Sequence, residues 1–337
     1  MISELYGRAT QYRRAWYGRR PHRTRQLDRP VISVGNLVVG GSGKTPLVAA
    51  LATLLAAAGE RPAILSRGYG RRQRADGVVV VNDGERVRAT PAQAGDEPYM
   101  LAQALPGVPV LVSPDRYLSG RLAECRLACT VHLLDDGFQH VQLARDVDLV
   151  VMARATLDER LLPFGALREP VVAARAADAL LVTGSDTDVE EISARLAVHT
   201  AFRVVSRYDA PRMMATSENP VHELRGRRAV AVAGIARPER FFTALRELGW
   251  DVARELAFRD HHWFTPRDID AIRRAAVETG ADVVITTEKD AVRLPVHTGM
   301  PWAVLPLQLL VEPPDRFGAW LAGRLAAARR RRIGDAA

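Results

Sequence analysis

The chain of 337 residues has few cysteines and no long apolar run, and each absence excludes a class of protein. Its two cysteines, Cys125 and Cys129, are too few for a disulfide framework and indicate a reducing compartment. No segment approaches the roughly 20 consecutive apolar residues that a membrane-spanning helix needs. The N-terminal segment also lacks the apolar stretch of a secretory signal, so we expect a location in the cytoplasm or on a membrane face.

Acidic residues are fewer than basic ones, which gives the chain a net charge of +8. Nearly all of the basic residues are arginine. This excess favours an anionic partner, which could be nucleic acid, anionic lipid or a phosphorylated substrate. The arginines are scattered and no nucleic-acid recognition motif is present, so we expect no nucleic acid partner. The 47% of hydrophobic and 26% of charged residues are typical of a globular protein.

The first 28 residues combine arginine with aromatic side chains. Tyr6, Trp16 and Tyr17 are separated by roughly helical spacings, and seven arginines are interleaved with them. A basic amphipathic helix with aromatic rings suits the headgroup region of a membrane. A solvated helix packed on the rest of the protein would show the same pattern, so both interpretations stay open here.

Apolar runs of strand length alternate with helical segments along most of the chain. Residues 30–36, 46–58 and 61–66 predict a strand, a helix and a strand, which is the order of a parallel βαβ unit. We expect further strands at 78–81, 109–112, 131–134, 147–152 and 179–182, and helices at 97–104 and 116–126.

A second α/β pattern follows. It consists of expected strands at 228–235, 251–256, 282–286 and 302–305, and expected helices at 238–248 and 266–279. The whole pattern predicts an α/β fold: a P-loop NTPase-like, doubly wound, mainly parallel sheet with a second, smaller α/β domain. We place a membrane-associating helix at 1–28, the P-loop core domain at 29–215 and the smaller domain at 216–337.

A glycine-rich turn between the first strand and the first helix of this pattern is typical of a phosphate-binding loop. It comprises Gly40, Gly41, Ser42, Gly43, Lys44 and Thr45. Glycines let backbone N–H groups converge on a polyphosphate, and the following helix directs its positive end at the phosphates. Lys44 would lie near the β- and γ-phosphates, and the Thr45 hydroxyl would ligate Mg²⁺. The strict motif has glycine at position 38, where this chain has Val38.

Two adjacent aspartates, Asp135 and Asp136, follow the strand expected at 131–134. Carboxylates at the carboxyl end of such a strand lie beside the phosphate-binding loop of a parallel sheet, where they can hold Mg²⁺. Because adjacent carboxylates repel each other, a bound cation would stabilise them. The alternative is an exposed Asp-Asp-Gly turn without a ligand.

Several other segments end in polar residues where an α/β site is built. Asp96 precedes an expected helix, where it could cap the helix or accept a hydroxyl proton as a base. Arg67 lies in a glycine- and arginine-rich loop that could bind phosphate or could carry no ligand. His261 and His262 follow Asp260, without enough further ligands for a zinc site, so one of these residues is expected to orient a catalytic group.

Taken in order, these motifs resemble those of the lipid A 4′-kinase (tetraacyldisaccharide 4′-kinase) family. The resemblance rests on residues 33–36, 40–46, 66–70, 95–98, 135–140, 161–169, 260–262 and 286–290, with Asp-Asp-Gly-Phe-Gln-His at 135–140 and Leu-Arg-Glu-Pro at 167–170 the most specific. It implies transfer of phosphate from ATP, with Mg²⁺, to the 4′-hydroxyl of a tetraacylated glucosamine disaccharide 1-phosphate in lipid A biosynthesis. It also implies peripheral or monotopic attachment to the cytoplasmic face of the inner membrane.

The same resemblance implies roles for individual residues. Asp96 matches the proposed base of the family, and His261, preferred to His262, matches its partner. Arg168 matches an arginine near the phosphates. The implied metal ligands are Thr45, Asp135 and Asp136; Lys44 serves the nucleotide, and Asp135 and Asp136 also contribute to the electrostatics of catalysis. The implied partners are an anionic acylated disaccharide lipid and the cytoplasmic membrane surface, and we expect a monomer.

A different class of protein shares part of this pattern. A P-loop switch-type NTPase, of the partition or metal-chaperone class, has a similar loop and acts through a protein partner. Such proteins usually carry a base-reading motif or additional switch residues, and neither is found in this chain. ATP hydrolysis at full rate without a lipid acceptor would favour this class.

Overall fold

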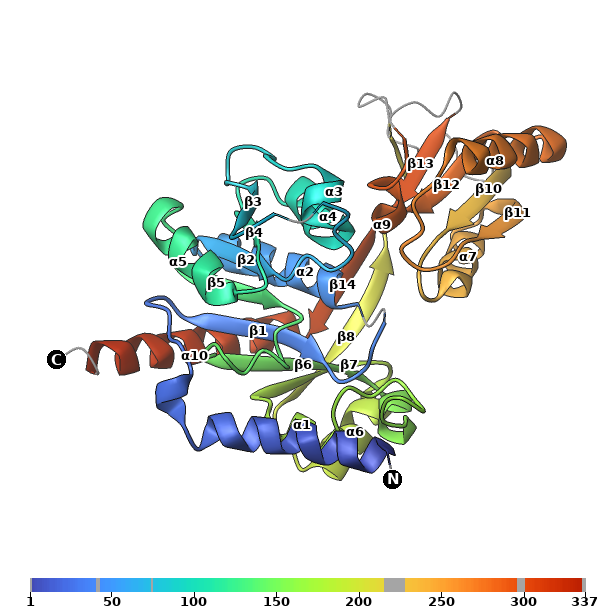
Figure 1. The fold of residues 1–337 in the computed structure, drawn as a ribbon. Helices are drawn as coiled ribbons and strands as arrows, with labels where there is room; N and C mark the ends of the chain where they lie inside the picture. The colour runs from blue at the N-terminus through green and yellow to red at the C-terminus, as the bar shows by residue number, and fades with distance from the viewer. Residues whose placement is uncertain (1, 41–42, 74, 215–227, 296–300, 335–337) are drawn as a thin grey trace.

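Two β-sheets organise the chain, one of nine strands and one of five (Figure 1). The structure is a computed structural model that describes residues 2–40, 43–73, 75–214, 228–295 and 301–334. We call the part built on the nine-stranded sheet the large unit (2–208 and 307–334) and the part built on the five-stranded sheet the small unit (212–305).

The large sheet has the strand order β14-β8-β7-β6-β1-β5-β2-β4-β3, and only its edge strands β3 and β14 pair antiparallel with their neighbours. Its strands are β1 (Val31–Asn36), β2 (Pro62–Ser66), β3 (Val79–Asn82), β4 (Val110–Val112), β5 (Val131–Asp135), β6 (Val147–Ala153), β7 (Ala179–Thr183), β8 (Ala201–Tyr208) and β14 (Leu307–Glu312). The chain leaves β1 toward β2 on one side and later adds β6, β7 and β8 on the other. This reversal beside β1 is where α/β sheets bind ligands.

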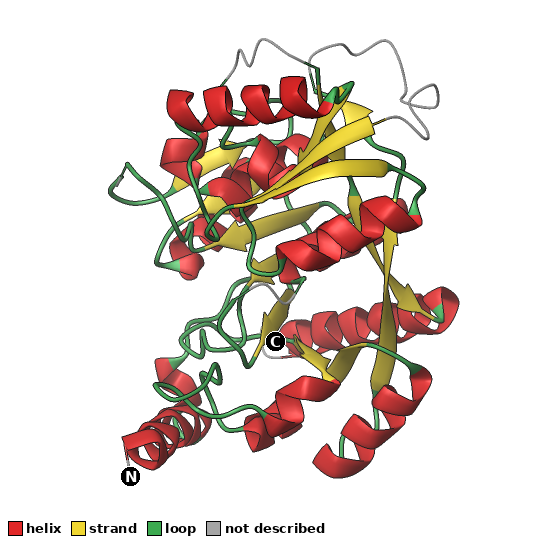
Figure 2. Ribbon diagram, turned by 90° about the vertical axis from the view of Figure 1, so that its right-hand side faces the viewer, coloured by secondary structure: helices red, strands yellow, loops and turns green. Residues whose placement is uncertain are grey.

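Helices cover both faces of the large sheet. They are α1 (Ile2–Gly18), α2 (Lys44–Ala57), α3 (Pro91–Ala94), α4 (Asp96–Ala104), α5 (Arg116–Arg126), α6 (Asp186–Leu196) and α10 (Pro314–Gly334). Side chains alternate along β1, so Ile32 packs with α2, α4 and α10 while Val31 packs on the side of α5. Helix α6 covers β6 and β7 on that second face. Figure 2 shows helices on both sides of the strands.

The small unit repeats this layering on a smaller scale. Its sheet has the order β11-β10-β12-β13-β9, and its elements are β9 (Arg212–Met213), β10 (Arg228–Ala233), β11 (Asp251–Ala257), β12 (Val283–Thr287), β13 (Trp302–Leu305), α7 (Pro238–Glu247), α8 (Pro266–Thr279) and α9 (Glu288–Ala291). Phe241 and Leu245 of α7 pack on one face, and Ile269 and Ile272 of α8 on the other. Within each helix the two residues are three or four positions apart, so they lie on the same side, and that side of the helix is buried.

Helix α1 lies along the large unit and is anchored to it. Gly7 is buried against Leu161 and Pro170, and Arg13 donates to the Gln139 carbonyl at 2.9 Å. The start of the helix nevertheless leaves apolar side chains in solvent, with Leu5 61% exposed. No helix in the described ranges has the length and apolar character to cross a bilayer.

The predicted fold class, a doubly wound, mainly parallel sheet with a smaller α/β unit, is confirmed. The predicted boundary at the C-terminus is corrected. Strand β14 pairs with β8, and α10 packs on the large sheet, so residues 307–334 return to the large unit instead of completing the small one. The sequence pattern missed both β8 and β14, because part of each strand faces solvent and lacks a continuous apolar run.

Candidate active site

The phosphate-binding loop joins β1 to α2. Gly43 has a φ of +76°, a conformation that favours glycine, and α2 begins at the next residue, Lys44. The Lys44 ammonium donates to Asn36 Oδ1 at 3.0 Å and lies 3.5 Å from Asp136 Oδ1. Of the other predicted loop residues, Gly40 is described at the start of the loop, and Thr45 in the first turn of α2 is 6% exposed. Gly41 and Ser42 lie outside the described residues.

The departure from the strict loop motif at Val38 has a structural reason. Val38 forms an isolated antiparallel bridge with Leu167, and the neighbouring backbone bonds run from Val39 N to the Ala166 carbonyl and from Arg168 N to the Leu37 carbonyl. This segment is therefore extended, a conformation that does not require glycine. The same pairing holds Arg168 beside the loop.

The acidic pair lies at the carboxyl end of β5, next to β1. Asp135 is 3% exposed and the Asp136 side chain is 39% exposed, so the pair does not form a fully exposed turn. Asp136 has a φ of +56° and accepts two hydrogen bonds of 2.8 Å from the guanidinium of Arg168. Arg168 also donates to Asn36, the residue that binds Lys44. Lys44, Asp136 and Arg168, predicted from separate motifs, therefore form one charged cluster.

Gly35 makes the approach of this segment to β1 possible. A Cβ at position 35 would lie 2.4 Å from Phe138 Cβ and 2.7 Å from its backbone nitrogen. Any larger residue at position 35 would push the segment after Asp136 away from β1. The glycine in the strand is therefore a requirement of the site.

The two aspartates differ in their electrostatics. Burial, followed by the negative charges of Glu97 and Asp136, raises the pKa of Asp135 to about 7. Burial would also raise the pKa of Asp136, but the hydrogen bond from Arg168 and the charge of Lys44 lower it to about 2. Asp136 is thus an ionised partner of two cations, whereas Asp135 is poised to gain a cation.

Thr45 and Asp135 have the chemistry to hold Mg²⁺. Within the described part of the chain, Asp135 Oδ1 is buried without a hydrogen-bond partner, and oxygen donors are the ligands that Mg²⁺ takes. No cluster of three or more His, Cys, Asp or Glu residues suited to a metal occurs in the described ranges. A metal bound mainly through phosphates and water, with few protein ligands, is the usual arrangement for Mg²⁺ at nucleotides. The metal role of Asp136 stays a prediction, since Arg168 binds both of its oxygens.

Asp96 pairs with His261 across the two units. Asp96 is the first residue of α4, is 4% exposed, and its Oδ2 lies 2.7 Å from His261 Nδ1. Gly95 precedes the helix and no side chain caps it, so the helix-cap interpretation of Asp96 is not supported. Burial would raise the pKa of Asp96, but the hydrogen bond with His261 and the charges of Lys289 and Arg293 lower it.

His262 has a different environment from His261. Its Nε2 lies 3.0 Å from Asp268 Oδ2, and its ring stacks on Phe258 with centroids 4.8 Å apart. It therefore belongs to the packing of the small unit around the start of α8. The structure agrees with the preference for His261 as the partner of Asp96.

Arg67 lies in the loop that follows β2. Burial, followed by the charge of Arg67, lowers the pKa of Arg116 to about 10, while Asp136 and Asp135 raise it. The same loop contacts the small unit, because the Tyr69 ring lies 5.7 Å from that of His261. This ring contact brings the glycine- and arginine-rich loop beside His261. Whether Arg67 binds nucleotide stays a prediction.

Several residues of the site had no role in the sequence-based prediction. Asn36 ends a strand and binds two predicted cations, and its position between strand and loop was the available signal. Arg293 is fully buried beside Asp96 at 3.7 Å, and nothing in its local sequence indicates that contact. Lys289 lies 3.2 Å from His261 Nε2, within the 286–290 motif to which we assigned no function from sequence.

Comparisons with known proteins identify the family of this chain. A family model described as tetraacyldisaccharide-1-P 4′-kinase (LpxK) matches residues 1–326. A tetraacyldisaccharide 4′-kinase of Geobacter metallireducens is 41% identical over 319 residues, covering 93% of this chain and 94% of that protein. The one of Geobacter sulfurreducens is 41% identical over 317 residues, covering 92% and 88%.

A solved structure extends the likeness to three dimensions. The crystal structure of LpxK from Aquifex aeolicus in complex with ATP is 33% identical, with a TM-score of 0.79, and the match covers 96% of this chain and 97% of that one. The phosphate-binding loop, the acidic pair and the Asp96–His261 pair are thus found in a chain that matches a kinase family over nearly its full length. This protein belongs to the tetraacyldisaccharide-1-P 4′-kinase family and is a kinase that uses ATP and Mg²⁺.

Proposed function

We propose that this chain transfers the γ-phosphate of ATP to the 4′-hydroxyl of a tetraacylated glucosamine disaccharide 1-phosphate, the acceptor that its family name denotes. In this reaction the acceptor O–H bond breaks and its oxygen bonds to the γ-phosphorus. The bond between that phosphorus and the β–γ bridging oxygen breaks, and ADP leaves. The proton passes to a base of the protein.

Asp96 is our candidate for this base. Its Oδ2 is engaged by His261, and within the part of the chain that the structure describes its Oδ1 accepts only the Glu97 N–H, at 3.1 Å. A lone pair of Oδ1 is therefore available for the hydroxyl proton. The neighbouring cations keep the carboxylate ionised, as a base requires. Lys44 and Arg168 would stabilise the charge that spreads over the phosphate oxygens. Bound Mg²⁺, held by Thr45 and Asp135, would supply further positive charge there.

The observation that carries this proposal is the 2.7 Å contact between Asp96 and His261, which joins the two units at the first turn of α4. The test is transfer of labelled phosphate from ATP to the acylated disaccharide by the purified protein. Asp96→Asn and His261→Gln should each lower kcat by at least about 100-fold, the range of general base catalysis.

His262→Gln is the matched control, because this neighbouring histidine also binds an aspartate but lies in the packing of the small unit. It should retain kcat within a few fold. Equal losses in His261→Gln and His262→Gln, with melting temperatures unchanged, would show that the Asp96–His261 contact has no special role in transfer.

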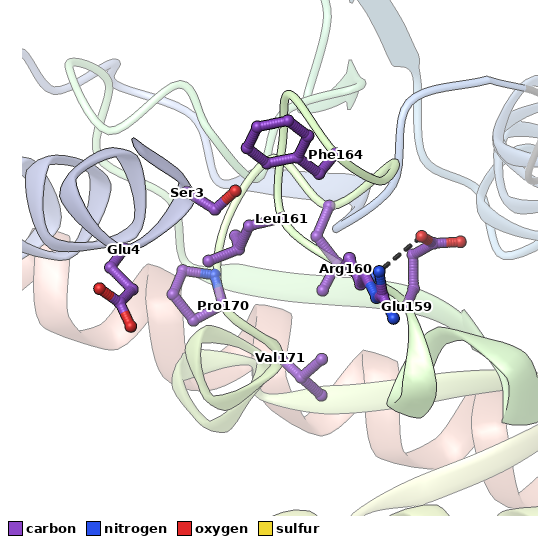
Figure 3. Close-up of a pocket in the computed structure, with 9 residues that line it drawn as sticks. Ser3, Glu4, Glu159, Arg160, Leu161, Phe164, Pro170 and Val171 are labelled. Carbon is purple, nitrogen blue, oxygen red and sulfur yellow. Dashed lines mark hydrogen bonds between the residues drawn. The ribbon is translucent and has the colours of Figure 1, made fainter. Parts of the chain in front are cut away.

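We also infer that the protein binds the cytoplasmic membrane surface through the start of α1 and the loop after β6. Ser3 and Glu4 of α1 face Leu161, Phe164 and five further residues between 159 and 171 across a hollow of about 510 Å³ (Figure 3). Exposed apolar side chains lie on both of these segments, Ile2 (59%) and Leu5 (61%) on α1 and Phe164 (68%) on the loop, and Val172 (42%) lies in the 3-10 helix that follows the loop. Arginines of α1 would meet anionic headgroups, each contributing about 1 kcal/mol.

Vesicle flotation tests this inference. Leu5→Asp with Phe164→Asp should weaken binding to anionic vesicles at least tenfold, since two apolar anchors are lost and negative charge is added. Val277→Asp is the matched control, because Val277 is 77% exposed but lies on α8 of the small unit. Unchanged flotation of the double variant would overturn the assignment of this surface.

The remaining expectations about partners are proposals as well. We propose that the protein acts as a monomer without nucleic acid, since several of its arginines are engaged in ion pairs within the fold, such as Arg332 with Asp146 and Arg25 with Asp115. Sedimentation at micromolar concentration, with and without DNA, should give one species of monomer mass. A second, DNA-dependent species would contradict the proposal.

A further inference from the structure

Lys289 occupies a central position among the charged groups around His261. It is the second residue of α9, and its ammonium lies 3.2 Å from Glu97 Oε1, 3.3 Å from Asp260 Oδ1 and 3.2 Å from His261 Nε2. An ammonium has three N–H donors and no acceptor, so these three contacts satisfy it fully. The side chain is 17% exposed, which leaves little room for water to replace any of them.

Lys289 stays protonated in this environment. Burial opposes the ammonium, but the carboxylates of Glu97, Asp96 and Asp260 outweigh it and raise the pKa of Lys289. Because the ammonium can only donate, His261 Nε2 must accept. The imidazole proton is then on Nδ1, where it is donated to Asp96 Oδ2 at 2.7 Å.

The position of Lys289 is fixed by the start of α9. Asp290 accepts from Gly234 N at 3.0 Å and from Thr287 Oγ1 at 2.6 Å, and it is paired with the fully buried Arg293 at 2.7 Å. These contacts tie α9 to β10 and β12 on both sides of Lys289. The ammonium therefore has a defined place relative to His261.

The composition of the chain provides an independent argument. Only two of its 47 basic residues are lysine, Lys44 in the phosphate-binding loop and Lys289. At position 289 the chain has lysine, whose compact ammonium can reach several acceptors at one point. The planar guanidinium of arginine, with its donors in a fixed fork, does not match that arrangement.

We propose that Lys289 is a positioning residue for phosphoryl transfer: by donating to Nε2, it fixes His261 as the neutral tautomer with its proton on Nδ1. This tautomer orients Asp96 through a hydrogen bond and leaves its carboxylate ionised. The opposite tautomer would place the Nδ1 lone pair against that carboxylate and an N–H against the ammonium. Asp260 Oδ2, at 3.8 Å from Nε2, is too distant to accept from it.

The tautomer itself can be observed in the free, full-length protein. With ¹⁵N-labelled histidine the chain gives eight imidazoles, and His261→Gln identifies the signals of His261. We expect a protonated Nδ1 and an unprotonated Nε2 at neutral pH. A proton on Nε2 of the wild-type protein, in a neutral or a charged ring, would overturn the proposal.

Substitution of Lys289 tests the cause. Lys289→Met keeps the length of the side chain and removes the donors, so the His261 signals should shift toward the other tautomer or exchange between both. Arg72→Gln removes a nearby charge that stacks on Trp263, and it should leave the His261 signals unchanged. A wild-type pattern in Lys289→Met would show that another group fixes the tautomer.

The effect on turnover rests on the proposed function. Lys289→Met should lower kcat at least tenfold and leave KM for ATP within about twofold, because the acceptor side of the site is disturbed. Wild-type kcat in a folded Lys289→Met variant would refute the positioning role. The histidine signals report the tautomer of His261 whatever the acceptor is. A wrong tautomer assignment and a wrong assignment of the reaction would therefore give different results.

Discussion

Arg14 joins helix α1 to the segment that carries the acidic pair, and its loss should destabilise the protein strongly. Its guanidinium donates to both carboxylate oxygens of Glu169, at 2.9 and 3.0 Å, and to the Phe138 carbonyl at 3.0 Å. It also lies 3.9 Å from the centroid of the Phe138 ring. The Glu169 side chain is only 5% exposed, so water cannot take the place of the cation.

The expected magnitude follows from this burial. Arg14→Leu leaves a buried carboxylate without its partner, which costs about 3–5 kcal/mol of unfolding free energy. Replacing both members by leucine removes both charges, and such replacements are often close to neutral. The double-mutant cycle of Arg14 and Glu169 should therefore give a coupling energy of at least about 2 kcal/mol.

Urea unfolding of the four proteins, followed by circular dichroism, measures this coupling. The exposed pair Arg254–Glu278, whose side chains are 45% and 59% exposed, is the matched control and should couple by less than about 1 kcal/mol. If the Arg14–Glu169 coupling is no larger than that of the control pair, a buried ion pair does not anchor α1. Loss of the pair should also lower kcat, since Glu169 follows Arg168 in the chain.

Three further predictions concern the charged cluster. Lys44→Met should lower kcat by at least about 100-fold with the melting temperature nearly unchanged, measured by labelled phosphate transfer. Arg168→Lys should lower kcat at least tenfold, because lysine cannot reproduce the bidentate contact with Asp136; full activity would argue that its charge alone suffices. Asp135→Asn should raise the melting temperature of the metal-free protein by a few degrees at pH 8 and abolish its stabilisation by Mg²⁺ with ATP. The pKa of Asp135 rises from 3.8 to about 7 on folding, so the free-energy cost of its charge in the folded protein grows between these pH values and is constant above them. The melting temperatures of the wild type and of Asp135→Asn should therefore become equal near pH 4.

Much of the large unit could be predicted from sequence because its central strands are buried on both faces. Strands such as β1 and β5 are continuous apolar runs, and a glycine-rich turn followed by Lys44 marks the edge where ligands bind. The return of the chain to this sheet could not be predicted in the same way. The pairing of β14 with β8 joins segments about 100 residues apart, as Leu307 with Tyr208, and nothing in either segment specifies the other.

Some residues of the site could likewise be predicted from local sequence, and others depend on contacts between distant segments. Lys44, Asp135 and Asp96 lie at strand or helix ends of the large unit, where local patterns indicate a ligand. The choice of His261 over its neighbour depends on which ring reaches Asp96, a contact between residues 165 positions apart. No repeating pattern in the sequence encodes a contact between residues so far apart. The packing of the two units determines which histidine reaches Asp96.

The proposed roles of Asp96 and His261 involve both units in the chemistry. The large unit supplies the phosphate-binding loop, Asp96 and Glu97, and the small unit supplies His261 and Lys289. Two polar contacts join these sets, from His261 to Asp96 at 2.7 Å and from Lys289 to Glu97 at 3.2 Å, and both end on the first turn of α4. The proposed base, Asp96, is therefore oriented by His261 only when the units are in contact. A change that separates them should reduce transfer to the acceptor more than it weakens binding of ATP, because every nucleotide-binding residue of the phosphate-binding loop belongs to the large unit.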